Sequence, residues 1–208
     1  MRLLLLSLAA LGLWAADLPK LTYSKSFPGS QPAYMSITVD REGNSTYQEA
    51  PQDDNPLAFK LSPQETAALF AKAEKLGRFT RPLESGLRVA RMGDKTFRYE
   101  NGEEKHEVKF NYSLDPDAQA LLDWFEIVAE SEQYFIALER AVKFDKLGVN
   151  DALLALDVAL GQDRLAARSQ FLPLLDRVAK NESFMHMARA RAADLAESIR
   201  NPKPVVQK

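Results

Sequence analysis

Cysteine is absent from the 208-residue chain, and its absence excludes several classes of protein. Without a thiol there is no disulfide, no thiolate ligand for a metal and no cysteine nucleophile. A lipoprotein, whose lipid is attached to a cysteine at the cleavage point, is excluded as well. The fold must therefore be stabilised by the packing of its core.

Histidine is scarce, and the two copies, His106 and His186, lie far apart in the chain. A zinc site at His106 would need carboxylates from elsewhere, so a partly exposed strand residue is the favoured interpretation. His186 lies between Met185 and Met187, which point about 200° apart on a helix and cannot both bind one copper ion. We therefore expect no metal site and no cofactor.

Catalytic and nucleotide-binding motifs are also missing. The chain contains no Gly-x-Ser-x-Gly, no phosphate-binding loop, no Gly-x-Gly-x-x-Gly and no His-Glu-x-x-His. Residues 17–133 carry 14 Lys and Arg against 20 Asp and Glu, and residues 134–208 carry 12 against 9. Neither excess forms the concentrated basic face that nucleic acid requires. We favour a protein that is not an enzyme and does not bind nucleic acid.

The N-terminus has the layout of a secretory signal peptide. Arg2 precedes an uncharged apolar run from Leu3 to Trp14, and the small pair Ala15-Ala16 follows. About a dozen apolar residues are too few to span a bilayer comfortably. We predict a signal peptide at residues 1–16 and export to the periplasm or the outside of the cell, with no stable membrane span after cleavage. An uncleaved anchor is the alternative.

Residues 17–130 are predicted to form an antiparallel sheet with one packed helix. The helix is expected over 63–76, because Ser62 and Glu65 form a capping box and Gly77 suits its end. Strands are expected at the segments Leu21–Phe27, Ala33–Val39, Asn44–Gln48 and Leu87–Met92, and a hairpin over Lys95–Tyr112. A tight turn at Asn101-Gly102 would place Tyr99 opposite Glu104 and Phe97 opposite His106.

A long helix is predicted from Asp115, which can cap it, to about Lys146. Its apolar stripe recurs every three, four or seven residues and lapses only at Ser131-Glu132. If the two halves of the chain pivot, the bend is expected there. The stripe consists of Leu121, Phe125, Val128, Phe135, Leu138 and Val142.

The remainder, residues 131–201, is predicted to be an all-helical tail, with a frayed end at 202–208. One helix would be capped by Asn150, a second would span Ser169–Ala179, and a third would be capped within 181–183. The Leu and Ala spacing resembles a helical-repeat array, but no repeat of fixed period is present, so a compact helical cap is the alternative. The predicted class is α+β: a small antiparallel sheet with a packed helix, joined by a long helix to a C-terminal helical hairpin bundle.

Four residues are candidates for an interaction surface. Trp124 and Tyr134 lie off the centre of the stripe, where burial is favoured and an exposed binding patch is the alternative. Arg189 and Arg191 give the last helix a basic side, which suits an anionic ligand or is simply a solvated face.

Three carboxylates, Asp123, Glu126 and Glu130, lie on one side of the long helix. Paired carboxylates support acid–base chemistry when they lie in a cleft, whereas a charge row opposite an apolar stripe is usually a solvated face.

The element order of the first half resembles small sheet-plus-helix inhibitor or binding folds of the cystatin type. The run Met92–Tyr99, followed by Phe110–Ser113, is similar to uncharacterised exported bacterial proteins. These resemblances carry no activity and no functional residues.

The sequence thus favours an exported, non-catalytic protein-interaction or scaffold protein with a protein partner. One alternative is a carboxylate-dependent hydrolase with its site at the sheet–tail junction. The other is an inhibitor that presents the first hairpin or the loop Pro28–Ser30 to an exported enzyme.

Overall fold

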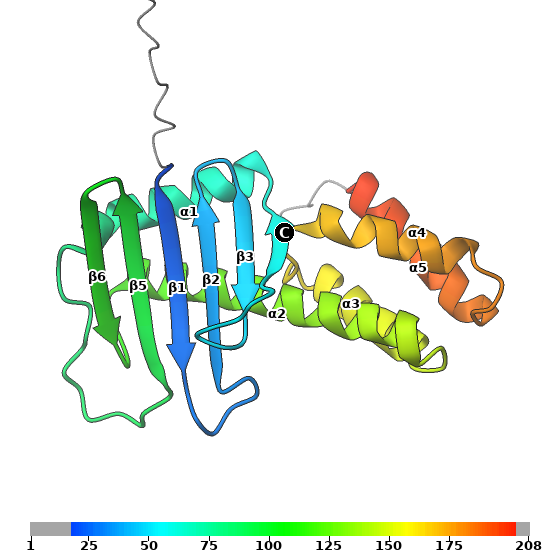
Figure 1. The fold of residues 1–208 in the computed structure, drawn as a ribbon, viewed down its shortest axis with the longest axis horizontal. Helices are drawn as coiled ribbons and strands as arrows, with labels where there is room; N and C mark the ends of the chain where they lie inside the picture. The colour runs from blue at the N-terminus through cyan, green and yellow to red at the C-terminus, as the bar shows by residue number, and fades with distance from the viewer. Residues whose placement is uncertain (1–17, 203–208) are drawn as a thin grey trace, which may run out of the picture.

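The computed structural model describes residues 18–202, and it confirms the α+β class. One antiparallel sheet forms one half of the molecule and a bundle of helices forms the other, with a long helix running through both (Figure 1). The predicted signal peptide and residues 203–208 of the predicted frayed end lie outside the described residues. Within residues 18–202, no helix has the length and apolar character needed to cross a membrane.

The sheet has six strands in the order β4-β3-β2-β1-β5-β6, and every neighbouring pair is antiparallel. Alternate residues such as Leu21, Ile37 and Phe97 point to one face and are fully buried. Thr22, Thr38 and other polar residues occupy the opposite face, which none of the helices within residues 18–202 covers. The strands are β1 (Lys20–Ser26), β2 (Tyr34–Asp40), β3 (Asn44–Gln48), β4 (Leu57–Lys60), β5 (Asp94–Asn101) and β6 (Glu104–Phe110).

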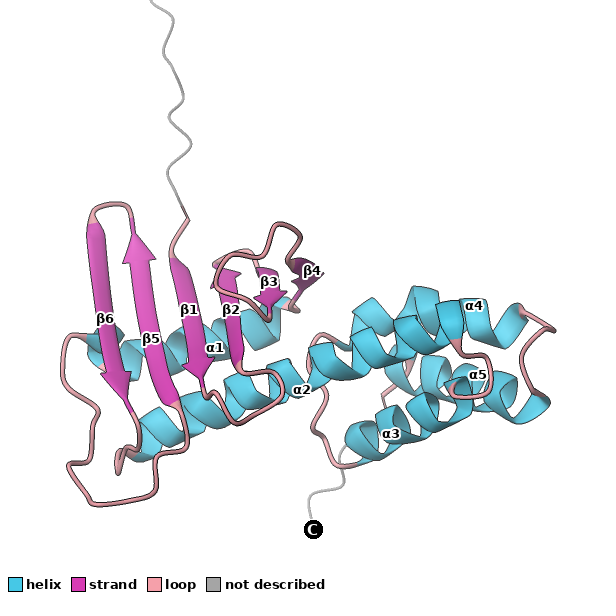
Figure 2. Cartoon of the chain, turned by 60° about the horizontal axis from the view of Figure 1, so that its bottom comes forward, coloured by secondary structure: helices cyan, strands magenta, loops and turns pink. Residues whose placement is uncertain are grey.

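Two helices, α1 (Pro63–Lys75) and α2 (Pro116–Phe144), cover the apolar face of the sheet (Figure 2). The predicted capping box is present: Glu65 N–H donates to Ser62 Oγ, and Ser62 N–H donates to Glu65 Oε2. Asp115 caps α2 by accepting the amides of Asp117 and Ala118. Both helix starts therefore follow from local sequence alone.

The hairpin of β5 and β6 forms with a register two residues from the predicted one. Tyr99 lies opposite His106, Phe97 opposite Val108, and Asn101 opposite Glu104. The turn therefore centres on Gly102-Glu103, and only Gly102 has a positive φ, of 59°. This register pairs Phe97 directly with an apolar residue, which favours it over the predicted pairing with His106.

The predicted strand over 87–92 is wrong. Those residues belong to a long loop, residues 80–93, that follows the short 3-10 helix η1 (Gly77–Phe79) and leads to β5. Residues 87–92 are exposed and pair with no strand of the sheet, so the local pattern alone does not produce a strand. Conversely, β4 was not predicted, because its four residues give too short a pattern to recognise.

The tail consists of the rear of α2 with α3 (Val149–Gly161), η2 (Arg168–Phe171), α4 (Leu172–Lys180) and α5 (His186–Arg200). The rear of α2 lies beside α3, and α4 lies beside α5 (Figure 1). The prediction that Asn150 caps α3 is wrong, since Gly148 occupies that position without a side-chain bond. Asn150 Oδ1 instead accepts from Arg191 Nη1.

Buried apolar residues form two clusters that divide along α2. The first cluster contains the sheet, α1 and the α2 residues up to Ala129, and the second begins at Leu138 and contains the tail helices. Ala166 and Ala167, which come from the tail, nevertheless belong to the first cluster. The loop between α3 and η2 thus packs against the sheet half.

Candidate functional site

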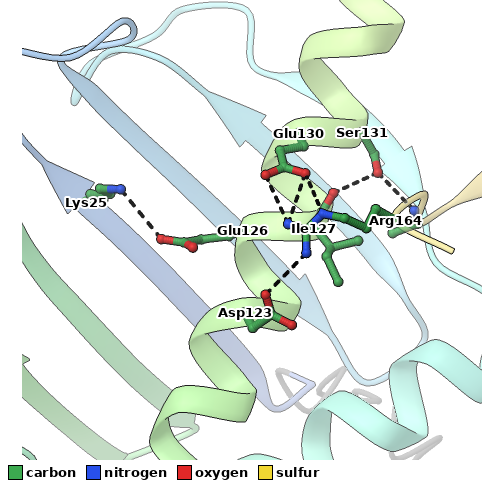
Figure 3. A network of polar contacts seen from close by, with 8 residues as sticks. Lys25, Asp123, Glu126, Ile127, Glu130, Ser131 and Arg164 are labelled. Carbon is green, nitrogen blue, oxygen red and sulfur yellow. Dashed lines mark hydrogen bonds and ion pairs between the residues drawn. The ribbon is translucent and has the colours of Figure 1, made fainter. Parts of the chain in front are cut away.

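The three carboxylates on one side of α2 each form an ion pair with a basic side chain, Lys25 or Arg164 (Figure 3). Glu126 Oε1 lies 3.5 Å from Lys25 Nζ on β1. Glu130 accepts hydrogen bonds from Arg164 Nε at 3.2 Å and Nη2 at 3.0 Å, and Asp123 Oδ1 lies 3.5 Å from Arg164 Nη1. Arg164 follows α3, so Asp123 and Glu130 fasten the tail to the long helix, while Glu126 joins it to the sheet.

Ser131 and Glu132 are both fully buried, although they interrupt the apolar stripe. Ser131 Oγ donates to Ile127 O at 2.7 Å and accepts the Ala166 N–H at 2.9 Å. Glu132 Oε1 accepts from Gln170 Nε2 at 2.8 Å, while its Oε2 has no partner in the described part of the chain. Burial raises the pKa of Glu132 to about 7. The interruption of the apolar stripe at Ser131-Glu132 is therefore a polar contact between α2 and the tail.

A residue of α1 completes this junction. Glu65 uses Oε2 for its own helix cap, and its Oε1 accepts the Ala167 N–H at 2.9 Å. The loop 162–168 is thus bound by side chains from α1 and α2 together. α2 is one uninterrupted helix from Pro116 to Phe144, so the helix continues through Ser131-Glu132, where a bend was expected if the two halves pivot.

A shallow depression of about 230 Å³ lies beside the junction, lined by Lys25, Glu126, Glu130, Gln133 and the loop before β2. Its two carboxylates are the ones held by Lys25 and Arg164. A general acid or base must be free to exchange a proton with a substrate. This arrangement suits a structural contact better than the hydrolase that the sequence left open.

A larger groove of about 780 Å³ lies on the open face of the sheet. Its floor contains hydroxyl groups of β1 and β5, namely Ser24, Ser26 and Thr96, and its wall is the loop that precedes β5. Leu87, Val89 and Arg91 of that loop also line the groove. The predicted strand segment therefore presents alternate side chains to the groove.

Asn111 and Glu84 hold this loop in place. The Asn111 side chain accepts the Met92 N–H at 3.0 Å and donates to Ala90 O at 3.2 Å. Glu84 Oε2 accepts the Asn111 N–H at 2.6 Å, and this bond lowers the pKa of the Glu84 carboxyl. The Ser85 N–H donates to Tyr112 O at 2.8 Å. The loop therefore has fixed contacts with the end of β6.

Large apolar side chains are exposed where these two segments meet. Leu87, Val89 and Met92 of the loop are 53%, 42% and 59% exposed, and Tyr112 and Leu114 after β6 are 39% and 60% exposed. We call these five residues the loop patch. Leu87 and Val89 also line the groove, and exposed apolar groups of this kind are typical of interaction surfaces.

The predicted interaction residues do not form one surface. Trp124 is half-buried against the sheet cluster, where its ring lies edge-on to Phe125 at 5.5 Å. Tyr134 is half-buried against the tail cluster. Ten residues of helix, about 15 Å, separate them, so each belongs to a different half of the molecule.

Arg189 and Arg191 also face the protein. Arg189 Nε donates to Ala179 O at 3.4 Å, near the end of α4, and Arg191 Nη1 donates to Asn150 at the start of α3. Both guanidinium groups are half-buried. They connect tail helices, and they do not form a free basic face.

The structure does not bring the two histidines together with other ligands. His106 Nδ1 lies 3.7 Å from Glu104 Oε1, and His186 is exposed at the start of α5. Among residues 18–202, no group of three His, Asp or Glu side chains is arranged to hold a metal ion.

Sequence reasoning missed the loop patch and the junction residues Arg164 and Gln170. The sequence carries one signal for this junction, the polar pair Ser131-Glu132 within the apolar stripe of the long helix. Glu132 lies four residues after Val128 and three before Phe135, both members of the stripe. Neither the protein-family models nor the curated proteins gave a match to this chain.

Proposed function

We propose that this chain is an exported, non-catalytic protein that binds a protein partner, as an interaction or scaffold protein. The loop patch is the observation that carries the proposal, because it exposes five large apolar side chains, two of which, Leu87 and Val89, line the groove. The pairing of Asp123, Glu126 and Glu130 with basic side chains also supports a binding role over catalysis.

The loop Phe27–Ala33 extends the proposed surface. A Cβ atom added at Gly93 would lie 2.9 Å from Phe27 Cβ, so this loop touches the segment that carries the loop patch. A partner seated on the groove would therefore meet Pro28–Ser30 as well. An exported enzyme is one such partner, which keeps the inhibitor role within this proposal.

The test is retention of a partner by the immobilised chain from the cell-envelope and medium fractions of its source. We expect a specific protein to be retained by the wild type and lost with the double variant Leu87→Glu/Met92→Glu. The matched control is Leu154→Glu/Val158→Glu, which changes two exposed apolar residues of α3 in the tail. Equal retention by all three proteins would contradict the proposed surface, as would loss only with the control.

Export is tested separately by determining the N-terminus of the protein recovered from those fractions. A mature chain that begins after Ala16 is expected. Recovery of the protein only from the cytoplasm would contradict export without affecting the binding surface.

A further inference from the structure

Glu132 is a buried carboxyl group without a cation. It is 0% exposed, and no lysine, arginine or histidine among residues 18–202 forms an ion pair with it. Its Oε1 has a single donor, Gln170 Nε2, and its Oε2 has none. A charged carboxylate in such a place is strongly disfavoured, whereas the neutral acid is tolerated.

The titratable groups around Glu132 do not relieve this cost. Tyr47 of β3 interacts electrostatically with Glu132. Burial raises the pKa of the Tyr47 hydroxyl above its usual range, so the phenol stays neutral. That hydroxyl donates to Glu49 at 2.8 Å. The ionisable side chains that hold or lie in segment 162–170 have their own partners: Glu65 accepts the Ala167 N–H, and Arg168 is bound to Asp163. Within residues 18–202, burial and the Gln170 hydrogen bond thus determine the ionisation of Glu132, and no cation offsets the burial.

Glu132 also lies where the two halves of the molecule meet. Gln170 belongs to η2 of the tail, and the adjacent Ser131 holds Ala166, which packs into the sheet cluster. Because Gln170 of this segment is the donor to Glu132, movement of segment 162–170 away from α2 removes that donor and opens the carboxyl to water. Ionisation and opening of this contact are therefore linked.

We propose that the contact between segment 162–170 and α2 is a proton-dependent latch, closed when the Glu132 carboxyl is neutral and loosened when it is ionised. The latch does not depend on the proposed binding function or on export. It acts on the loop that attaches the tail to the sheet half, and α2 itself remains continuous.

Two backbone amides report directly on the latch. Ala166 N–H donates to Ser131 and Ala167 N–H donates to Glu65, and both residues are buried. Their hydrogen-exchange protection factors, corrected for the intrinsic pH dependence of exchange, measure how often the segment opens. The amide of Phe97, in the centre of the sheet, serves as the internal reference.

The expected result is a loss of protection at Ala166 and Ala167, but not at Phe97, as pH rises from 5 to 8. The carboxyl titrates at about 7 when closed and near 4.5 when exposed, so opening should become roughly fifty- to a hundredfold more frequent over this interval. In Glu132→Gln, protection should be independent of pH. In Glu139→Gln, a control on the same helix whose carboxylate pairs with Lys143 and not with segment 162–170, it should fall as in the wild type.

A second measurement does not depend on a Glu132 variant. Because the chain has no cysteine, Glu103→Cys and Ser169→Cys give two unique, exposed labelling sites, one on the sheet half and one on segment 162–170. The distribution of distances between spin labels at these sites should broaden between pH 5 and 8. Protection at Ala166 that stays constant in the wild type, or that falls equally in Glu132→Gln, would overturn the latch. So would a label distribution that does not change with pH.

Discussion

Arg164 binds Glu130 through two nitrogens, with Nη2 3.0 Å from Oε1 and Nε 3.2 Å from Oε2. The two residues are 34 positions apart and join the end of α3 to the middle of α2. This contact lies at the surface beside the buried pair Ser131 and Glu132. The junction therefore has an exposed ionic layer over a buried polar one, and the two layers should respond differently to mutation.

The exposed layer should contribute little to stability. Arg164→Ala is expected to lower the free energy of unfolding by less than about 1 kcal/mol, because its side chain and that of Glu130 are 37% and 42% exposed and water screens the pair. Urea unfolding at low and high salt measures this, and the difference from wild type should shrink as salt rises. Arg88→Ala, on the exposed loop, is the control. A loss of several kcal/mol that persists in high salt would contradict a surface role for the pair.

The buried layer should make stability depend on pH. The pKa of Glu132 is about 7 in the folded chain and near 4.5 when exposed, so the folded state binds more protons between these values. Stability should therefore fall as pH rises from about 4.5 to 7, by up to about 3 kcal/mol, and then level off.

Urea unfolding of the wild type and Glu132→Gln across this range measures the effect. The Gln variant should lack this contribution to the slope, so the difference in stability between the two proteins should change with pH. A constant difference from pH 4.5 to 8 would show that Glu132 does not titrate as expected.

Ser131→Ala should be costly although it removes a single oxygen. The Ala166 N–H would lose its acceptor in a buried place, and a buried unsatisfied donor costs about 1–3 kcal/mol. Thermal or urea unfolding gives the value, and Ser169→Ala, at an exposed position, provides the comparison. Equal stability of the two alanine variants would mean that Ser131 does not hold the tail loop.

Much of the fold could be predicted because its signals are local. Ser62 with Glu65, Asp115 with Pro116, and the alternation in β1, β2 and β5 each lie within a few residues of chain. The register of the β5–β6 hairpin was missed by two residues, since both registers keep the same side chains on the core face. The choice depends on whether Phe97 meets Val108 or His106, and turn sequence alone does not decide it.

The junction could not be predicted, because its partners come from distant parts of the sequence. Ser131 and Glu132 looked like an interruption of an apolar stripe until Ala166 and Gln170 were placed against them. The strand prediction for residues 87–92 was wrong because a strand requires hydrogen bonding to a neighbouring strand. The local pattern suits a strand but does not show whether that pairing forms. Polar residues at stripe positions are thus the one local sign of a buried contact.

Substitution of Glu65 should weaken both the cap of α1 and the contact with the tail loop, because one side chain serves both. Glu65→Ala removes the reciprocal cap bond to Ser62 N–H and also the acceptor of the buried Ala167 N–H. Ser62→Ala disturbs only the cap, at a cost of about 1 kcal/mol. We therefore expect Glu65→Ala to be the more destabilising of the two in urea unfolding.

The same substitution should couple to Ser131→Ala, since Glu65 and Ser131 hold adjacent amides of one loop. Once either bond is lost, the segment 166–167 can move and the second bond stabilises less. The double variant should be less destabilised than the sum of the single variants by at least about 0.5 kcal/mol, the size typical of residues that share a partner. Ser62→Ala combined with Ser131→Ala should be additive, because Ser62 does not contact the loop. Additive costs in the Glu65–Ser131 pair would mean that the two side chains act on independent parts of the tail.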